Sequence, residues 1–340
     1  MREAKSTYVI AEVGVNHDGD LGKAVYLLEQ AAQAGADAVK FQTFKTELLV
    51  RARQERMPYQ VASDGGDRTQ FEMLRALELG HREHALLRDR AKALGLDFIS
   101  TPYDAPSAAF LAALPVDALK IASTDAGNIP LLRQVAGYGL PVIYSTGVSA
   151  LWEVVKAVEE GLAGLDRRKL TVLHCVSNYP APQDELNLRV MARFAALFDC
   201  PVGFSDHSAS LLMGAYAVCA GASVLEKHFT HDKAAAGPDH QASLEPGELR
   251  EYIARVREAE RALGDGVKRV QPSERAIKPH MQKSLTAARP LPAGRLLEAG
   301  DLSSMRPADG ISPLFVDEVV GRRLAVDKAP GDPLFWRDLG

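Results

Sequence analysis

The sequence predicts an α/β protein: a (β/α)8 barrel, or TIM barrel, followed by a small β-rich domain. Short apolar runs alternate with longer amphipathic segments, and this texture changes near residue 282. Eight runs precede residue 232, and eight strand–helix repeats are typical of a closed parallel barrel. The runs are Tyr8–Val13, Ala38–Phe44, Asp97–Thr101, Ala118–Ser123, Pro141–Thr146, Leu170–Ser177, Pro201–His207 and Ser223–Thr230. The alternative is a doubly wound open sheet, but no G-x-G-x-x-G motif follows the first run.

Segments with helical patterning separate these runs. Examples are Leu21–Ala34, His84–Leu94 and Leu151–Gly161. Gly35 and Gly95 predict helix ends that lead directly into the next strand. The long polar insertion Lys45–Arg68 follows the second run, and loops of this length are usually lids or mobile segments.

The change of texture predicts the domain organisation. We expect a barrel domain over residues 1–265, a linker over residues 266–281 and a second domain over residues 282–340. The second domain is rich in Pro and Gly turns and contains short strand-like pieces, namely Leu285–Ala288 and Leu324–Val326.

Composition excludes several classes of protein. The 340 residues are 46% hydrophobic and carry a net charge of −4 with both signs intermixed, which argues against a nucleic-acid or membrane-surface protein. We find no signal peptide and no apolar span long enough for a membrane helix. The scattered cysteines Cys175, Cys200 and Cys219 predict reduced thiols in the cytoplasm.

Polar side chains follow every apolar run at the same end. In a (β/α)8 barrel the chemistry occurs at the C-terminal ends of the strands, and unpaired buried charge is costly. The polar pieces are Glu12–His17, Lys40–Gln42, Ser100–Pro102, Lys120–Asp125, Ser145–Gly147, His174 with Ser177–Pro180, Ser205–His207 and Glu226–His228. This joint pattern predicts an active site at the mouth of the barrel.

Two kinds of site fit these residues. Lys40 and Lys120, with hydroxyls nearby, predict a pocket for a small phosphorylated acid; the alternative is a pair of structural ion pairs with Glu12 and Glu226. His207 and His228 end adjacent strands, so their rings can meet on one metal ion with positions left open; the alternative is two hydrogen-bonded core histidines. Glu226 shares a strand face with His228, which suits a general base beside a metal ligand.

The motifs, in this order, resemble those of the sialic acid synthase family. The matching stretches are Ala11–His17, Gly35–Lys45, Ser100–Pro102, Lys120–Ser123, Ser145–Gly147, Leu173–Cys175, Tyr179–Pro180, Ser205–His207, Leu225–Thr230, Gly237–His240, Ser243–Leu249, Lys283–Ser284 and Met305–Pro307. The resemblance covers nearly the whole chain. Its last part falls in the family's C-terminal antifreeze-like (SAF) domain.

The resemblance implies condensation of phosphoenolpyruvate with an open-chain N-acetylmannosamine-type sugar, giving a sialic acid such as N-acetylneuraminate and phosphate. It also implies a divalent metal, manganese or magnesium, and a domain-swapped homodimer in which the small domain of one chain covers the other barrel. His207 and His228 match the metal ligands and Glu226 the general base. Phosphoenolpyruvate contacts are matched by Lys40, Thr101, Lys120, Ser123 and Ser145. The sugar side is matched by Glu12, Gln42, Tyr179, Asp239 and Arg306, with Arg306 reaching the other chain's barrel.

Two further residues complete the predicted site, and one position leaves the acceptor open. Ser205 lies in a matching motif and is predicted to bind substrate, and Asp125 joins Glu12 and Glu226 as a predicted catalytic carboxylate. Asp125 stands where bacterial members of the family often carry Glu, whereas animal members, which use the 6-phosphorylated sugar, carry Asp. Some members supply an Asn from the loop after the second strand, and residues 45–80 contain none. A phosphorylated sugar and the precursors of legionaminic or pseudaminic acid are therefore alternative acceptors.

Two alternative functions outside this family are disfavoured by the sequence. A metal hydrolase on the same fold normally needs an H-x-H motif on the first strand, where this chain has Glu12-Val-Gly. A non-catalytic carbohydrate-binding protein would not need two lysines and two histidines at one mouth.

Overall fold

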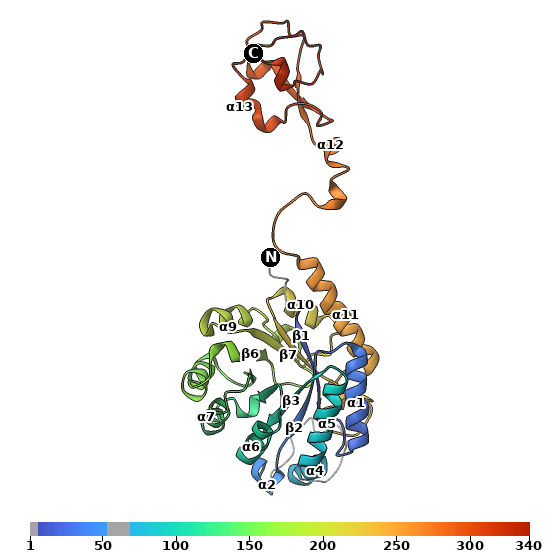
Figure 1. Ribbon diagram of the computed structural model, residues 1–340, viewed down its shortest axis with the longest axis vertical. Helices are drawn as coiled ribbons and strands as arrows, with labels where there is room; N and C mark the ends of the chain where they lie inside the picture. The colour runs from blue at the N-terminus through green and yellow to red at the C-terminus, as the bar shows by residue number, and fades with distance from the viewer. Residues whose placement is uncertain (1–5, 53–68) are drawn as a thin grey trace. The chain divides into compact units, whose positions relative to one another are not determined.

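The computed structural model describes residues 6–52 and 69–340, so part of the predicted lid segment lies outside the described residues. Eight parallel strands close into a barrel in chain order, and helices surround it (Figure 1). The predicted (β/α)8 fold is confirmed. The strands are β1 (Tyr8–Gly14), β2 (Ala38–Thr43), β3 (Asp97–Pro102), β4 (Ala118–Ile121), β5 (Val142–Ser145), β6 (Leu170–Cys175), β7 (Val202–Asp206) and β8 (Val224–His228).

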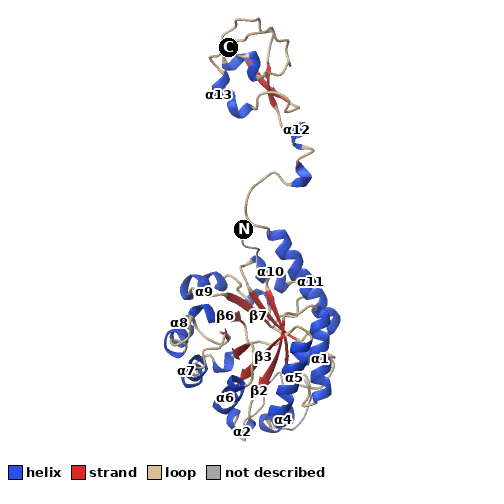
Figure 2. Cartoon of the chain, in the orientation of Figure 1, coloured by secondary structure: helices blue, strands red, loops and turns tan. Residues whose placement is uncertain are grey.

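The α-helices cover the outside of the barrel wall (Figure 2). Apolar faces of the helices and the outward side chains of the strands form the main core between the two layers. The helices are α1 (Leu21–Ala34), α2 (Thr46–Leu49), α4 (Gln70–Leu77), α5 (His81–Ala93), α6 (Ala105–Ala113), α7 (Ile129–Gly137), α8 (Leu151–Lys156), α9 (Val190–Phe198), α10 (Met213–Cys219) and α11 (Pro246–Leu263).

Local sequence signals account for the helix ends. α1 begins after Asp20, whose carboxylate accepts a hydrogen bond from the Lys23 amide at 2.9 Å, and it ends at Gly35 with φ of 86°. α5 begins one turn before the predicted start because the Glu83 carboxylate accepts the Gly80 amide. The segment predicted as one helix over Leu151–Gly161 is α8 followed by a π-helical turn.

The chain divides into two compact units, residues 1–265 and 266–340. The second unit contains a 3-10 turn at Pro272–Glu274, α12 (Lys278–Met281), the antiparallel pair β9 (Ser284–Ala287) and β10 (Leu302–Met305), and α13 (Val316–Val319). Its own small core is built from Leu285, Ala287, Leu291, Leu297, Ile311, Val319, Leu324 and Leu334. The boundaries of the predicted linker stay a prediction.

The predicted strand over Leu324–Val326 is wrong, because Leu324 forms only a single bridge, with Leu339. β10 was not predicted: it is four residues long and has two serines, so it lacks an apolar signature.

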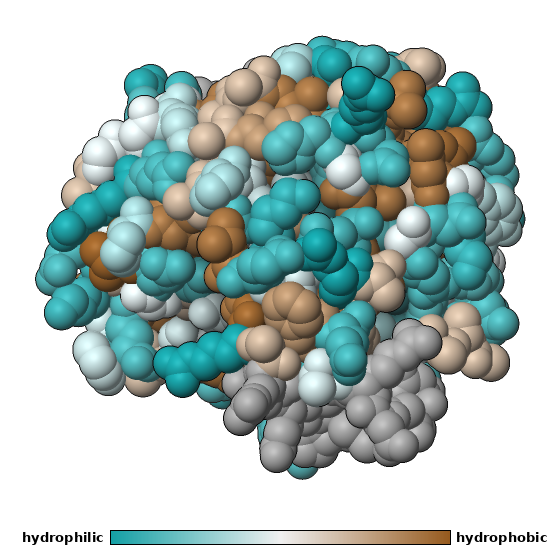
Figure 3. Space-filling view, turned by 90° about the horizontal axis from the view of Figure 1, so that it is seen from below, coloured by the Kyte–Doolittle hydropathy of each residue, from teal (hydrophilic) through white to brown (hydrophobic). Residues whose placement is uncertain are grey.

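No helix in the described parts of the chain combines the length and the apolar character that crossing a membrane requires. The face shown in Figure 3 intersperses hydrophilic with hydrophobic residues.

Candidate active site

The inward-facing side chains of the strands form an apolar floor with a polar layer next to it. The floor consists of Ile10, Ala38, Ile99, Ala118, Ile143, Leu173 and Val224. Two residues further along the same strands lie Glu12, Lys40, Thr101, Lys120, Ser145, Cys175 and Glu226, all buried. Side chains two positions apart on a strand point to the same side, so one step towards the C-terminal end changes the barrel interior from apolar to ionisable.

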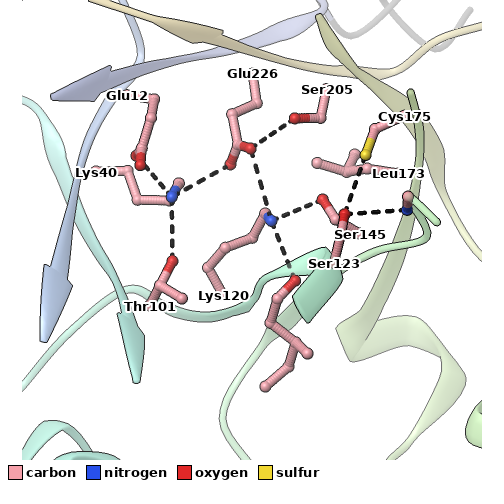
Figure 4. A network of polar contacts seen from close by, with 12 residues as sticks. Glu12, Lys40, Thr101, Lys120, Ser123, Ser145, Leu173, Cys175, Ser205 and Glu226 are labelled. Atoms are coloured by element: carbon pink, nitrogen blue, oxygen red, sulfur yellow. Dashed lines mark hydrogen bonds and ion pairs between the residues drawn. The ribbon is translucent and has the colours of Figure 1, made fainter. Parts of the chain in front are cut away.

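Lys40, on β2, pairs with carboxylates from β1 and β8, two strands that are neighbours in the closed barrel. Its Nζ lies 2.6 Å from Glu12 Oε2 and 3.8 Å from Glu226 Oε2 (Figure 4). It also donates to Thr101 Oγ1 at 3.1 Å. The ammonium therefore has three oxygen partners in a dry setting.

Lys120 lies on the other side of Glu226. Its Nζ donates to Ser145 Oγ at 2.7 Å and to the Ile121 carbonyl at 3.1 Å, and it lies 3.6 Å from Glu226 Oε1. Ser205 Oγ donates to the same Glu226 Oε1 at 2.8 Å. Glu226 thus sits between two lysines (Figure 4). The ion pairs of the two lysines with Glu12 and Glu226, predicted as the structural alternative, are present.

Burial and neighbouring charges shift the pKa values of these groups in different directions. Burial raises the pKa of Glu226, but Lys120 and Lys40 outweigh it and hold that pKa at about 2. Burial raises the pKa of Glu12 although Lys40 opposes it, and burial lowers the pKa of Lys120 although Glu226 opposes it. Glu226 is consequently a carboxylate at neutral pH.

A tight corner next to Lys120 joins Ser123, Cys175 and Gly147. Ser123 Oγ accepts the Gly147 amide at 3.0 Å and contacts Cys175 Sγ at 3.1 Å. A Cβ on Gly147 would lie 2.6 Å from Ser123 Oγ and 2.7 Å from Cys175 Sγ, so only glycine fits this approach. The backbone amide can therefore reach the polar layer.

His207 and His228 lie together where β7 and β8 end, with ring centroids 5.4 Å apart. The Nδ1 of His207 donates to the Val176 carbonyl at 2.8 Å, since a carbonyl oxygen only accepts, and this leaves its Nε2 with the lone pair. The Nδ1 of His228 is buried and has no hydrogen-bond partner among the residues that the structure describes. Burial lowers the pKa of His207 to about 4 and that of His228 well below its usual range, so both rings are neutral.

These features fit a divalent metal held by two imidazoles. Metal ligands must be deprotonated, and a second nitrogen anchored to a backbone carbonyl is the usual support. In residues 6–52 and 69–340, no group of three or more His, Cys, Asp or Glu side chains could hold a metal ion. A metal here would keep several positions for water or substrate.

Of the other predicted site residues, Tyr179 and Asp239 lie beside these histidines, and Gln42 lies beside Glu12. The Tyr179 ring lies 4.2 Å from that of His207 and 5.6 Å from that of His228, between centroids. Asp239 Oδ2 is 3.9 Å from His228 Nδ1, and burial raises the pKa of Asp239 to about 6. Gln42 Nε2 donates to Glu12 Oε1 at 3.2 Å.

Two predicted residues lie outside the contacts of the polar layer. Asp125 is half-buried in a 3-10 turn after β4 and accepts from Asn128 Nδ2 at 2.8 Å. Burial raises its pKa. Arg306 is exposed and follows β10 in the second unit. The roles of both stay predictions.

Sequence reasoning missed Tyr103 and Asn16. Burial raises the pKa of Tyr103 well above its usual range, and the negative charges of Glu12 and Asp239 add to the effect. Asn16 donates to the Phe229 carbonyl at 2.9 Å and to a loop serine at 2.8 Å. Their signal was position alone, because Tyr103 directly follows the end of β3 and Asn16 lies two residues after the end of β1.

A cavity of about 630 Å³ opens beside the polar layer, between α8, β6 and α9. Its lining includes Cys175 and Ser177, but none of the lysines, carboxylates or metal-type histidines described above. The side-chain chemistry therefore places the candidate active site in the barrel mouth and not in this cavity.

Ionisable side chains gathered at the C-terminal mouth of a (β/α)8 barrel are typical of an enzyme, and comparison with known proteins identifies the family. Residues 27–268 match the NeuB family, and residues 282–340 match the SAF domain. The chain belongs to the NeuB family and is an enzyme of the synthase type. The resemblance predicted from the motifs is confirmed.

Named relatives span almost the whole chain. N,N'-diacetyllegionaminic acid synthase of Legionella pneumophila is 42% identical, over 98% of this chain and 94% of that protein. N-acetylneuraminate-9-phosphate synthase of Homo sapiens is 34% identical, over 96% of this chain and 91% of that protein. The crystal structure of N-acetylneuraminic acid synthetase from Leptospira borgpetersenii, in complex with citrate, is 33% identical, with a TM-score of 0.69, over 80% of this chain and 90% of that one.

Proposed function

We propose that this enzyme condenses phosphoenolpyruvate with the open-chain aldehyde of N-acetylmannosamine, giving N-acetylneuraminate and inorganic phosphate. The observation that carries the proposal is the buried layer in which Lys40 and Lys120 flank Glu226, with Ser205 Oγ donating to Glu226 and lying 3.4 Å from His207 Nε2. The proposed site for the anionic donor and the two neutral imidazoles therefore both lie next to the carboxylate of Glu226.

The donor is bound by the lysines and the hydroxyls beside them. Lys40 and Lys120 supply charge, and the hydroxyl groups of Thr101, Ser123 and Ser145 supply directional hydrogen bonds. Without a donor, the lysines neutralise Glu12 and Glu226. A phosphate and a carboxylate entering the layer compete for the same ammonium groups, which draws positive charge away from Glu226.

The reaction forms one carbon–carbon bond and one carbon–oxygen bond, the latter to water, and it breaks the carbon–oxygen bond to phosphate. The alkene carbon of phosphoenolpyruvate attacks the aldehyde carbon of the sugar, and the aldehyde oxygen takes a proton to become a hydroxyl. Water adds to the cation-like carbon that carries the phosphate ester and gives up a proton. The hydroxyl formed from this water then loses its proton as phosphate leaves with its bridging oxygen, and a 2-keto acid remains.

Glu226 is the proposed general base for the water. Its carboxylate accepts the Ser205 hydroxyl and lies within ion-pair distance of both lysines, so it is ionised before the donor binds. Departure of the lysines towards the donor removes the interactions that lower its pKa and makes it a better base when it is needed.

His207 and His228 are the proposed ligands of a divalent metal, manganese or magnesium. When bound, the metal supplies Lewis-acid polarisation of the aldehyde oxygen. The protein's own contribution is to keep both imidazoles neutral by burial and to hold the His207 ring through the Val176 carbonyl.

The sugar side of the proposal comprises Glu12, Gln42, Tyr179, Asp125 and Asp239 from the barrel, together with the partner subunit's Arg306 in a domain-swapped homodimer. A mixed dimer tests the sharing. One chain carries Arg306→Ala and the other carries His207→Ala. One working site is expected if Arg306 acts on the other barrel, and none if it acts on its own.

A diacetamido sugar, the precursor of N,N'-diacetyllegionaminic acid, is the second candidate acceptor. It is favoured by the 42% identity to the Legionella pneumophila synthase. The test is a panel of aldehyde sugars: N-acetylmannosamine, its 6-phosphate and the diacetamido sugar, each with labelled phosphoenolpyruvate and Mn²⁺. Release of phosphate with none of them contradicts the proposed reaction. The proposal includes a cytoplasmic location, in keeping with three free cysteines.

A further inference from the structure

An ion pair lies directly behind the two histidines, on the outer side of the barrel wall. Asp206 and Lys227 are register partners on β7 and β8, and each immediately precedes a histidine, His207 or His228. Lys227 Nζ is 3.3 Å from Asp206 Oδ2, and both side chains are 0% exposed. Alternation along the strands turns them away from the mouth.

A contribution to the stability of the fold does not by itself explain why the Asp206–Lys227 ion pair is buried here. Removing two charges from water costs several kcal/mol each, and a well-packed apolar pair of the same volume is often as stable or more stable. Helix α11 seals the pair from solvent, because the Tyr252 ring lies 5.8 Å from Lys227 Nζ. A Cβ on Gly214 would lie 2.5 Å from the Tyr252 hydroxyl, so helices α10 and α11 pack closely against each other at this point.

The pair holds the backbone on both sides of His207. Asp206 Oδ1 accepts from the Ser208 amide at 2.8 Å and from the Ser208 hydroxyl at 2.7 Å. Lys227 Nζ donates to the Ser208 carbonyl. Residues 206 and 208 are thus tied to each other and to residue 227, the neighbour of His228. The direction of the His207 side chain follows from a backbone that is fixed before and after it.

We propose that Asp206 and Lys227 are positioning residues that set the separation and orientation of His207 and His228. The inference deepens the proposed function, because it rests on the two histidines holding a divalent cation. The Asp206–Lys227 pair, which we call the clamp, acts through the backbone of β7 and β8 and touches neither imidazole. Its loss frees the ends of two strands that carry the metal ligands, and it leaves the lysines of the donor pocket on β2 and β4 unaffected.

The test measures Mn²⁺ binding by calorimetry on the purified full chain. The variants are Lys227→Met, which keeps the apolar stem, Lys227→Arg, which keeps the charge, and the double variant Asp206→Asn/Lys227→Met, which leaves no unpaired buried charge. The matched control is Asp37→Asn, which breaks an ion pair with Arg257 of 3.0 Å, at the residue directly before β2 begins. Phosphoenolpyruvate affinity and folding are measured on the same samples.

We expect Lys227→Met and the double variant to bind Mn²⁺ roughly 10- to 100-fold more weakly, the range measured for residues that support metal ligands. Phosphoenolpyruvate affinity stays within about threefold, and Lys227→Arg retains most of the Mn²⁺ affinity. Asp37→Asn binds Mn²⁺ as the wild type does. A merely structural role would weaken both ligands together.

Two results would overturn the inference. One is wild-type Mn²⁺ affinity in the folded double variant, which would assign any loss in Lys227→Met to the unpaired Asp206 charge. The other is equal loss of Mn²⁺ and phosphoenolpyruvate binding. Failure of the proposed function is separate: wild-type protein that binds no Mn²⁺, or His207→Ala that binds it normally, removes the metal role itself and the clamp with it.

Discussion

The floor and the polar layer of the barrel interior lie on the same strands, two residues apart, and differ completely in chemistry. Ile99 packs among aliphatic side chains, while Thr101 on the same strand accepts a hydrogen bond from Lys40 at 3.1 Å. Val224 and Glu226 show the same change on β8. The apolar floor closes the barrel and excludes water. The charges above it therefore interact strongly, because they lie in a medium of low dielectric constant.

Glu226→Gln has the largest expected effect, since it removes the proposed base while keeping the shape of the side chain. We expect turnover to fall by about 100- to 10,000-fold, the usual contribution of general acid–base catalysis, with Mn²⁺ affinity changed little. Phosphate release and calorimetry measure the two quantities. Val224→Ala, in the floor of the same strand, is the control and should keep most of the turnover per folded molecule. Turnover of Glu226→Gln within tenfold of wild type would remove its role as base.

Ile99→Ala tests the floor. The side chain is fully buried, so its truncation leaves a cavity, and the free energy of unfolding should fall by about 2–5 kcal/mol. Urea denaturation measures this loss, and steady-state kinetics should show an unchanged KM for phosphoenolpyruvate. A large rise in that KM with little loss of stability would reverse the roles assigned to the two layers.

Lowering the pH should protonate groups at the mouth of the barrel and so reduce stability there, whereas the floor has no ionisable group. The pKa of His207 is lowered to about 4 from 6.5, so its unfolded state binds more protons than its folded state between these values. Its stability contribution is complete above pH 6.5 and is lost as the pH falls towards 4. From pH 7 to pH 5 this amounts to about 2 kcal/mol. Metal-free His207→Gln should lose correspondingly less stability over this interval in urea titrations, and an identical loss would contradict the assignment.

Thr101→Val has the smallest expected effect. It removes one hydroxyl from Lys40 but keeps the volume, so the KM for phosphoenolpyruvate should rise about 2- to 10-fold, in line with about 0.5–1.5 kcal/mol for one hydrogen bond. Ser100→Ala is the matched control, because Ser100 faces the other side of the wall and contacts Thr43 Oγ1 at 2.7 Å. An equal KM effect from both variants would place the donor elsewhere.

The barrel was predictable in detail, whereas in the second unit only the strand predicted at Leu285–Ala288 is present, as β9 (Ser284–Ala287). Each barrel strand is an apolar run bounded by turn or helix signals, and all eight predicted runs are strands. The second unit pairs its chain through two short strands and isolated bridges, so periodicity assigned Leu324–Val326 wrongly and overlooked Leu302–Met305. Contacts at such bridges depend on distant residues and not on a local pattern.

The same contrast holds within the site. The spacing of Lys40, Lys120, Glu226 and His228 along strands predicted that they would meet. Lys227, one residue from His228, is fully buried against Asp206. The sequence did not predict this burial, because a lysine is usually exposed to solvent, and the helix that covers it, α11, lies further along the chain.

The alternation of side chains along a strand has a local period of two, so the amino-acid order alone was enough to predict the strands and the set of residues gathered at the mouth. The pairing of the charges, the position of Glu226 between two lysines, and the identity of the residues behind the histidines became apparent in the folded chain. Those choices depend on distances across strands far apart in the chain and on the water that the surrounding helices exclude.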